Sequence, residues 1–246
     1  MNMKVLNDVV GYKNLKIYQN TDWFLFSLDS VLLPNFVSLN LKDKVIIDFC
    51  SGNAAIPLIL SRKTKAQIFA VEIQKDLCDL ANESVIYNNL SDQIKVINCD
   101  VKNLHTIFQK NSVDVITCNP PYFKYDGKFD FNTDEHKTIA RHEKLIKLSD
   151  IVATANYLLK NKGRIAIVHR TDRLIEIINL FTSNGFQIKK IRFIYSKSDS
   201  ESNIVLVEAI KNGGIGLKVL SPLYVHNDDG SYTEEVLKMF GDDNNE

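Results

Sequence analysis

The chain of 246 residues has no long hydrophobic run and no leader-like segment. Its longest apolar runs, such as Val45–Phe49 and Ile204–Val207, are far too short to cross a bilayer. The first sixteen residues lack the apolar stretch of a secretory signal. The sequence therefore predicts a cytoplasmic protein that does not enter the membrane.

Cysteine is also scarce, with four residues and no Cys-x-x-Cys pair, which argues against a zinc ribbon. Three of the four, Cys50, Cys99 and Cys118, end apolar, strand-like runs. We interpret the cysteines as small buried residues of a protein in a reducing compartment, and we expect no metal site.

Positive and negative charges cancel, with 30 Lys and Arg residues against 30 Asp and Glu residues. The balance is uneven, because residues 227–246 contain seven acidic side chains and one basic side chain, which leaves six surplus positive charges on the rest. A mildly basic body fits a polyanionic partner without requiring one. With 45% hydrophobic and 24% charged residues, the composition excludes wholesale disorder.

Strand and helix patterns alternate through the middle of the chain. Short apolar runs, typical of strands buried in a parallel sheet, lie at Val45–Phe49, Ile68–Val71, Ile94–Cys99, Val113–Cys118 and Arg164–His169. Helical spacing lies between them, at Ala54–Arg62, Asp76–Asn88, Leu145–Leu159 and Leu174–Thr182. Two more strand-like runs follow with no helix between them, at Ile188–Tyr195 and Asn203–Ile210. The alternation predicts an α/β fold with seven strands, mostly parallel, an antiparallel C-terminal strand and helices on both faces.

We expect a single domain in three parts: an extension over residues 1–40, a core over 41–212 and a tail over 213–246. Asn184-Gly185 is a plausible stop for the last core helix. Residues 122–144 are polar and show no periodicity. A loop of that length inside a compact domain is usually functional.

Glycine is rare where a nucleotide-binding loop would need it. The first predicted strand leads through Asp48-Phe49-Cys50-Ser51-Gly52-Asn53-Ala54 into a helix. Open α/β sheets bring the backbone close to a nucleotide-like cofactor at such a turn. The dinucleotide fingerprint needs three glycines, and this loop has only Gly52, so a dehydrogenase is disfavoured. Cys50 and Ala54 are small, so the backbone can still approach a cofactor.

Acidic residues end the next two predicted strands. Glu72 lies 24 residues beyond Asp48, and a carboxylate there can accept hydrogen bonds from both hydroxyls of a ribose. Asp100 can accept from the exocyclic amine of an adenine. Each carboxylate could instead cap a helix or lie in solvent. Because these strand ends all open onto one crevice, the series favours a nucleoside cofactor.

The fourth predicted strand runs directly into Asn119-Pro120-Pro121-Tyr122, and its two prolines make the turn rigid. The Asn119 side-chain oxygen and the Pro120 carbonyl can accept both hydrogens of a planar NH₂ group, and Tyr122 offers an aromatic face to a heterocycle. This set suits methylation of an amide or aromatic amine, because acceptors push charge toward a poorly nucleophilic nitrogen. Positioning and electrostatics would then supply the catalysis without a strong base. The alternative is a proline turn that merely ends a strand.

These motifs resemble class I S-adenosylmethionine-dependent methyltransferases that carry an Asn-Pro-Pro-Tyr motif. The resemblance implies a Rossmann-like fold, with S-adenosylmethionine as methyl donor and S-adenosylhomocysteine as product. It implies catalytic roles for Asn119, Pro120, Pro121 and Tyr122. It also implies cofactor contacts from Phe26, Asp29, Asp48, Cys50, Ser51, Gly52, Asn53, Glu72, Ile73, Asp100, Val101 and Asn119.

Flanking segments resemble one branch, the bacterial tRNA-Val adenine-N6 methyltransferases. The similar segments are Phe26–Leu33, Ala140–Glu143, Leu220–His226 and Asp229–Glu235. The resemblance implies methylation at N6 of adenine 37, beside the anticodon of tRNA-Val, on a flipped-out base. Substrate contacts would come from Tyr122, Phe123, Lys124 and Arg141, and residues 1–40 would help to form the cofactor pocket. No obligatory protein partner is implied.

Other activities share the same catalytic motif and stay open. They are a glutamine N5-methyltransferase acting on release factors, a DNA adenine methyltransferase and another amino-methyltransferase of nucleic acids. A nucleotide-binding module that has lost catalysis is the alternative that is not an enzyme. If the substrate is RNA, basic side chains on the catalytic face would contact phosphates, and affinity would fall steeply with salt. The candidates are Lys124, Lys128, Lys137, Arg141, Lys160, Lys162, Arg170, Arg173, Lys189, Lys190 and Arg192.

Overall fold

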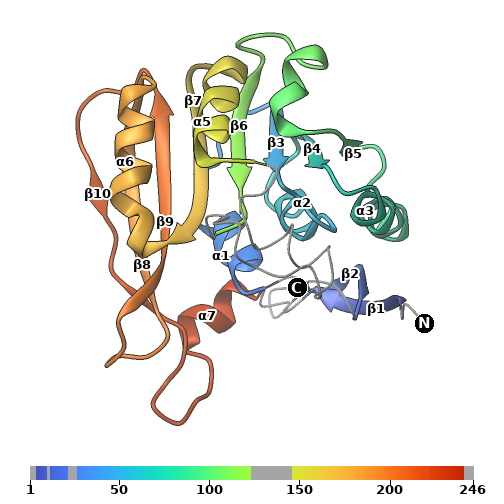
Figure 1. Ribbon diagram of the computed structural model, residues 1–246. Helices are drawn as coiled ribbons and strands as arrows, with labels where there is room; N and C mark the ends of the chain where they lie inside the picture. Colours follow the sequence, from blue (N-terminus) through green and yellow to red (C-terminus); the bar gives the residue numbers. More distant parts are fainter. Residues whose placement is uncertain (1–3, 10–11, 22–26, 123–145, 241–246) are drawn as a thin grey trace, which may run out of the picture.

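A central sheet with helices on both faces, and a separate N-terminal hairpin, make up the described residues 4–9, 12–21, 27–122 and 146–240 of the computed structural model (Figure 1). The strands are β1 Lys4–Val9, β2 Tyr12–Asn20, β3 Val45–Phe49, β4 Gln67–Glu72, β5 Ile94–Asn98, β6 Val113–Cys118, β7 Leu159–Arg170, β8 Phe186–Tyr195, β9 Ser202–Lys211, β10 Lys218–Val219 and β11 Leu223–Tyr224. The helices are α1 Asp29–Phe36, α2 Ala55–Ser61, α3 Lys75–Tyr87, α5 Leu148–Leu158, α6 Leu174–Ser183 and α7 Glu234–Met239, with 3-10 turns η1 Val101–Thr106 and η2 Thr171–Arg173. No helix in these ranges is long and apolar enough to cross a membrane.

The central sheet has the strand order β10-β8-β9-β7-β6-β3-β4-β5, with β11 beside β8. The strands β3 to β7 pair in parallel, and β9 is antiparallel to both of its neighbours, β7 and β8. In Figure 1, β6 accordingly points down and β9 points up. The seven longer strands confirm the predicted α/β sheet with its antiparallel strand. The two-residue strands β10 and β11 extend the β8 edge beyond the prediction, because two residues leave no readable pattern.

Most element boundaries follow from local chemistry. β3 and β6 coincide with the predicted strands, because their apolar runs are buried on both faces of a parallel sheet. α6 ends at Ser183, and Gly185 follows with a left-handed φ of 78°, which confirms the predicted helix stop. β7 begins at Leu159 rather than at the predicted Arg164. Its first residues are mostly polar, so the apolar pattern does not predict them as part of the strand.

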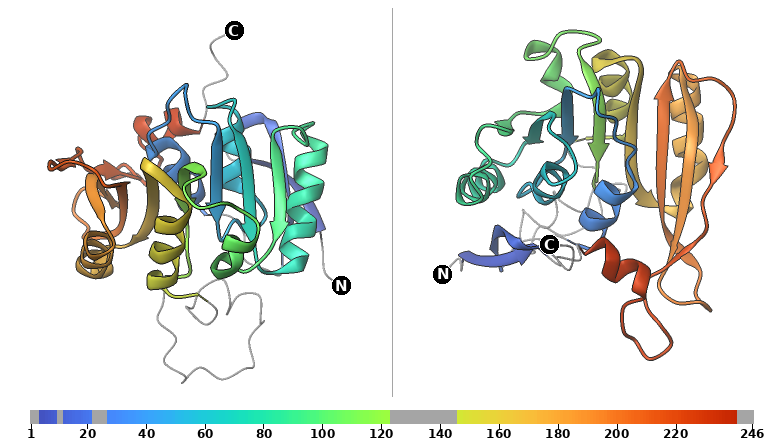
Figure 2. Two further views of the ribbon diagram at one scale, coloured as in Figure 1. Left: turned by 90° about the horizontal axis from the view of Figure 1, so that it is seen from above. Right: turned by 180° about the vertical axis from the view of Figure 1, so that it is seen from behind.

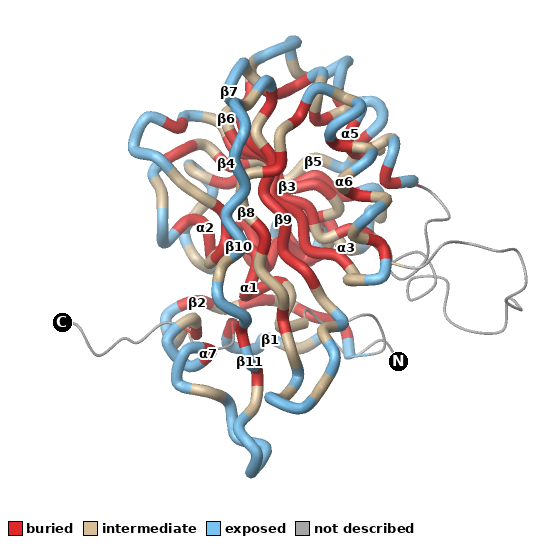
Figure 3. Tube along the Cα trace, turned by 90° about the vertical axis from the view of Figure 1, so that its left-hand side faces the viewer, coloured by how far each residue is buried: buried red, intermediate tan, exposed pale blue. Residues whose placement is uncertain are grey.

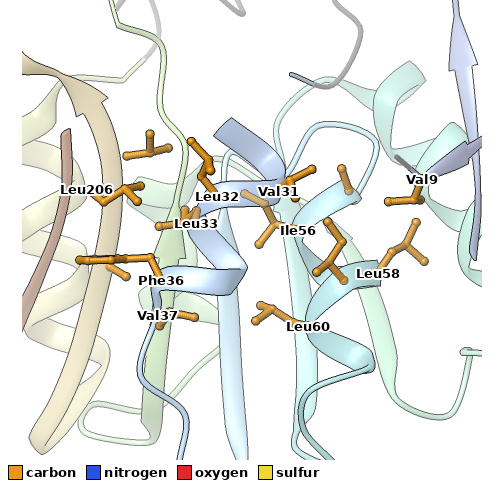
Figure 4. Close-up of a cluster of buried hydrophobic side chains, with 14 of the residues drawn as sticks. Val9, Val31, Leu32, Leu33, Phe36, Val37, Ile56, Leu58, Leu60 and Leu206 are labelled. Atoms are coloured by element: carbon orange, nitrogen blue, oxygen red, sulfur yellow. The ribbon is translucent and has the colours of Figure 1, made fainter. Parts of the chain in front are cut away.

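Neighbouring residues of each central strand face two different helical layers. Ile46 belongs to a core shared with α1 and α2, whereas Ile47 belongs to a core shared with α5 and α6. Figure 4 shows the first core, where Val31 of α1 lies beside Ile56 of α2. The two layers are visible from above in Figure 2, and the central strands are buried along much of their length in Figure 3. This double covering holds the strand ends rigidly at the edge of the sheet.

The hairpin of β1 and β2 and helix α1 were not predicted from the sequence. β2 lies against α3, where the Tyr18 amide donates to Ser84 Oγ at 2.9 Å. α1 lies against α7, and Asn35 Nδ2 donates to the Met239 carbonyl at 3.2 Å. In Figure 1 both N-terminal elements lie at the side of the molecule toward which β3 and β6 point. The hairpin and α1 therefore border the carboxyl ends of the central strands.

A buried polar network anchors the chain at the end of α1. Glu208 of β9 accepts hydrogen bonds from the Ser38 amide at 2.6 Å and from Ser38 Oγ at 2.8 Å. Lys190 of β8 donates to the Phe36 carbonyl at 2.6 Å. Charged groups persist in a protein interior only when they are paired and hydrogen-bonded, as these are. The network therefore fixes the orientation of α1 relative to the sheet.

Candidate active site

The order in which the chain adds strands to the sheet reverses between β3 and β6. The chain proceeds outward from β3 through β4 to β5, whereas β6 lies on the other side of β3. Ligands of open α/β sheets bind in the crevice outside the carboxyl ends of the strands at such a point. Phe49 pairs with Cys118, so the loop after β3 and the Asn-Pro-Pro-Tyr turn after β6 leave the sheet side by side. The structure thus brings the two main sequence motifs side by side at one edge of the sheet.

The loop after β3 has a left-handed backbone at alternate residues. The φ angles are 55° at Cys50, 56° at Gly52 and 67° at Ala54. This conformation costs a residue with a side chain roughly 1–2 kcal/mol, so Cys50 and Ala54 adopt at a cost what glycine would adopt freely. Asn53 Nδ2 donates to the Tyr18 carbonyl at 3.2 Å, which joins the N-terminal hairpin to this loop. The loop therefore has the backbone conformation of a glycine-rich loop, although only one of its three left-handed residues is glycine.

Asp48 is fully buried behind the loop. Its carboxylate accepts hydrogen bonds from Ser51 Oγ and Thr117 Oγ1, both at 2.6 Å. Burial raises the pKa of Asp48 from 3.8 to about 7; the two hydroxyls oppose this shift, and the nearby charge of Glu72 adds to it. Asp48 thus ties the loop to β6, and a direct cofactor contact from it stays a prediction. Thr117 did not figure among the predicted site residues, although a threonine inside an apolar strand is a readable signal.

Glu72 joins the end of β4 to the same loop. Its Oε2 accepts from the Gly52 amide at 2.9 Å, and its Oε1 accepts from the Gln74 amide at 2.9 Å. The side chain is buried, which raises the pKa of the carboxyl and excludes a solvated carboxylate. A carboxylate oxygen can accept more than one hydrogen bond, so both oxygens keep capacity for a ribose hydroxyl.

Asp100 caps the turn that follows β5. Its Oδ1 accepts from the Lys102 amide at 2.9 Å, which confirms the capping interpretation for this residue. Its contact with an adenine amine stays a prediction. Val101 is buried, whereas the Ile73 side chain is 39% exposed at the end of β4. Ile73 is therefore an apolar surface that a planar ring could cover at this edge.

The turn after β6 brings together Asn119, Tyr122 and Asp29. The Tyr122 hydroxyl lies 2.7 Å from Asn119 Oδ1 and 2.8 Å from Asp29 Oδ2. A phenol has one hydrogen, so it donates to one of the two oxygens at a time. Burial, and then the Asp29 charge, raises the pKa of Tyr122 well above its usual value, so the hydroxyl stays protonated. In this arrangement Tyr122 satisfies the oxygen that was predicted to receive a substrate amine.

His169 lies at the end of β7 and contacts the Tyr122 ring, with ring centroids 5.3 Å apart. It is fully buried, and its Nδ1 accepts from the Arg170 amide at 2.8 Å. The sequence correctly placed a strand end at His169, but the side chain was not assigned to the site. The rule that parallel strand ends share one crevice was a sufficient signal to include it.

Part of the predicted site lies outside the described residues. Those residues are Phe26, Phe123, Lys124, Lys128, Lys137 and Arg141. Lys160 and Lys162 occupy the first residues of β7, at the end of the sheet opposite the Asn-Pro-Pro-Tyr turn, so these two candidates do not cluster on the catalytic face. Arg173 is mostly buried; it pairs with Glu176 at 2.6 Å, and its Nη1 lies 3.4 Å from the Tyr122 carbonyl. Arg173 therefore stabilises the Asn-Pro-Pro-Tyr turn.

The four cysteines are free. Cys78 and Cys118 are buried, as predicted, whereas Cys50 and Cys99 are partly exposed because they follow strands at the crevice edge. Within the described ranges, no three His, Cys, Asp or Glu side chains gather as a metal ion would require.

A Rossmann-like sheet with its switch point between β3 and β6, a buried acid at the second strand end and a rigid amide-bearing turn define an α/β protein of the class that binds ligands at the carboxyl ends of its strands. The family model described as "Methyltransferase domain" matches residues 40–208. The chain therefore belongs to the methyltransferase-domain family, and the protein is a methyltransferase.

Named relatives point to the same family. The chain is 26% identical over 198 residues to a tRNA1(Val) (adenine(37)-N6)-methyltransferase of Tolumonas auensis, covering 80% of each chain. It is 28% identical over 195 residues to the protein of the same name from Trichodesmium erythraeum, covering 76% of this chain and 80% of the relative. A crystal structure of a predicted O-methyltransferase from Agrobacterium tumefaciens aligns with a TM-score of 0.66 at 21% identity, over 86% of this chain and 95% of that one. This last likeness confirms the fold.

Proposed function

We propose that the protein transfers the methyl group of S-adenosylmethionine to N6 of adenine 37 in the anticodon loop of tRNA-Val, in the cytoplasm. The observation that carries this proposal is the Asn119 oxygen, which lies 2.7 Å from a donor, the Tyr122 hydroxyl, beside the loop after β3 at the switch point of the sheet. The relatives named as tRNA1(Val) adenine-37 methyltransferases support the choice of substrate.

The crevice residues fit the nucleoside part of this cofactor. Glu72 keeps acceptor capacity for the ribose, and Ile73 offers an apolar surface beside it. The left-handed loop at Cys50, Gly52 and Ala54 allows close backbone approach. When bound, S-adenosylmethionine supplies a methyl group on a positively charged sulfur, and S-adenosylhomocysteine is the product.

The chemistry of the protein side follows from the Asn-Pro-Pro-Tyr turn. The adenine amine replaces the Tyr122 hydroxyl on Asn119 Oδ1, and the Pro120 carbonyl accepts its second hydrogen. These two acceptors orient the nitrogen lone pair and favour the charge that develops on nitrogen. The new N–C bond forms as the S–C bond of the donor breaks, and the positively charged nitrogen then releases one of its hydrogens as a proton to water. Asp29 Oδ2, at 2.8 Å, receives the displaced Tyr122 hydroxyl. The adenine reaches this turn flipped out of its loop, at a cost of a few kcal/mol, and Tyr122, Phe123, Lys124 and Arg141 hold the RNA.

Nucleoside mass spectrometry of tRNA tests this proposal directly. tRNA-Val from a deletion strain should lack N6-methyladenosine at position 37, and the complemented strain should regain it. A parallel assay with radiolabelled S-adenosylmethionine compares purified tRNA-Val with a release factor. Transfer to the release factor alone would replace the proposal with glutamine N5-methylation.

Substitution of Glu72 should weaken cofactor binding. Glu72→Ala removes charge-assisted hydrogen bonds, each worth about 1.5–3 kcal/mol, so the Kd for S-adenosylmethionine should rise about 10- to 150-fold. Calorimetric titration measures this change. Glu83→Ala is the matched control, because the Glu83 carboxylate lies on α3 and pairs with Lys4 on the surface. A Kd within about twofold of the wild type in Glu72→Ala would show that Glu72 serves only the protein backbone.

Two substitutions separate the stacking role of the Tyr122 ring from the role of its hydroxyl, which occupies the Asn119 oxygen. Tyr122→Ala removes the stacking ring, worth about 1–3 kcal/mol, so kcat/KM for tRNA should fall about 5- to 150-fold. Tyr122→Phe keeps the ring and frees the Asn119 oxygen, so kcat/KM should stay near or above that of the wild type. Steady-state kinetics with tRNA-Val tests both variants, with cofactor affinity as the control. A larger loss in Tyr122→Phe than in Tyr122→Ala would contradict stacking.

A further inference from the structure

The His169 side chain is a buried donor that no described group uses. Its exposed fraction is 0%, and its Nε2 has no hydrogen-bond partner in the described part of the chain. Nδ1 accepts from the Arg170 amide at 2.8 Å, so the ring hydrogen is on Nε2. Burial, with help from the Arg173 charge, lowers the pKa of His169 to about 4, so the ring is neutral at physiological pH. A buried N–H without an acceptor is unfavourable in a folded protein and calls for a function.

The position of His169 relates it to the Asn119 turn. Cys118 pairs with Ile167 in the parallel β6–β7 ladder, so both residue 120 and residue 169 lie two residues further along neighbouring strands. Tyr122 contacts both Asn119 and His169. Its hydroxyl lies 2.7 Å from Asn119 Oδ1, and its ring centroid lies 5.3 Å from that of His169. An aromatic ring with a donor on Asn119 is also what a bound adenine would present. The Tyr122 hydroxyl therefore fills the position on Asn119 Oδ1 that the adenine amine would take, next to His169.

We propose that His169 is a specificity-determining residue whose Nε2–H donates to a ring nitrogen of the target adenine, while Asn119 accepts from the adenine amine. This inference rests on the proposed adenine methylation. Adenine places an acceptor nitrogen beside its amine on both edges, N1 on the Watson–Crick edge and N7 on the major-groove edge. A neutral histidine locked as a donor complements either nitrogen, and it leaves the amine to the acceptors of the turn.

Deaza analogues test the contact atom by atom. Anticodon stem-loop RNAs carry adenosine, 1-deazaadenosine or 7-deazaadenosine at the target position, and kcat/KM is measured for each with the wild type and with His169→Phe. One analogue should lower kcat/KM of the wild type about tenfold, the usual loss for one hydrogen bond. The penalty of the same analogue should be about tenfold smaller in His169→Phe, because the donor is already gone. Any change in amine reactivity caused by the analogue cancels in this comparison.

The remaining outcomes distinguish the role of His169 from the proposed function. Equal penalties in the wild type and in His169→Phe, or no penalty from either analogue in the wild type, would overturn the role of His169. His169→Leu, which also lacks a donor, replaces His169→Phe if the larger ring prevents folding, as judged by cofactor affinity. His169→Gln, whose amide can donate, should keep part of the penalty. No transfer to the unmodified adenosine RNA by the wild type would instead reject the proposed function itself.

Discussion

Replacing Asn119 with alanine should lower kcat for methyl transfer about 100- to 1,000-fold, the usual cost of removing one group that stabilises developing charge in an active site. The Asn119 oxygen is the acceptor on which the nitrogen of the substrate depends, and in the structure it already holds a donor, the Tyr122 hydroxyl, at 2.7 Å. The Kd for S-adenosylmethionine should stay within about twofold of the wild-type value, because the loop after β3 and Glu72 are untouched. Single-turnover kinetics with saturating tRNA measures the chemical step.

Asn119→Asp is the matched variant for this experiment. It keeps an oxygen in the same place, so it should retain more activity than the alanine variant if acceptance of a hydrogen bond is the role of the residue. A parallel loss of cofactor affinity and kcat in Asn119→Ala would contradict that role. It would place Asn119 in the cofactor site instead.

The second large effect concerns Asp48 and the pH dependence of stability. The pKa of Asp48 rises from 3.8 to about 7 on folding, so between these pH values the folded state holds a proton that the unfolded state has lost. The free energy of unfolding should therefore fall as pH rises through this window, by about 1.4 kcal/mol for each pH unit and about 4 kcal/mol in all. Asp48→Asn removes the titrating group. Its unfolding free energy, measured in urea without cofactor at pH 5, 6, 7 and 8, should fall less steeply than that of the wild type.

Asp114 supplies the control for this slope. Its pKa is lowered, because the pairing with Lys160 at 2.7 Å and two backbone amides outweigh the effect of burial. Asp114 is thus ionised in both states between pH 5 and pH 8, and Asp114→Asn should shift the whole curve without changing its slope. Parallel curves for the wild type and Asp48→Asn would show that Asp48 keeps an ordinary pKa in the folded protein.

The central sheet could be predicted from sequence because its strands are short apolar runs that differ sharply from the amphipathic helices between them. The crevice could be predicted as well, since Gly52, Glu72 and Asn119 each follow a strand in a parallel series. The N-terminal hairpin was missed for a physical reason: β1 has mostly exposed or half-buried residues, and it is held by pairing with β2, which packs on α3. Leu15 and Ile17 do alternate with polar residues, which was the available signal for β2.

The details of the site depend on contacts that no local pattern contains. Asp29 lies 93 residues before Tyr122, and Thr117 lies 69 residues beyond Asp48. The left-handed backbone at Cys50 and Ala54 is equally hidden, because their side chains normally disfavour it. Such features arise when the whole fold determines a position against its local preference.

The packing of α7 on α1 has a consequence for biosynthesis. Asn35 and its partner Met239 are 204 residues apart, so a ribosome adding about 5–20 residues per second needs about 10–40 s to make the second after the first. During that time α1 lacks its contacts with α7, whereas its other partners, α2 and β7, are synthesised earlier. The packing of α7 on α1 therefore forms last, after every strand of the central sheet has been synthesised.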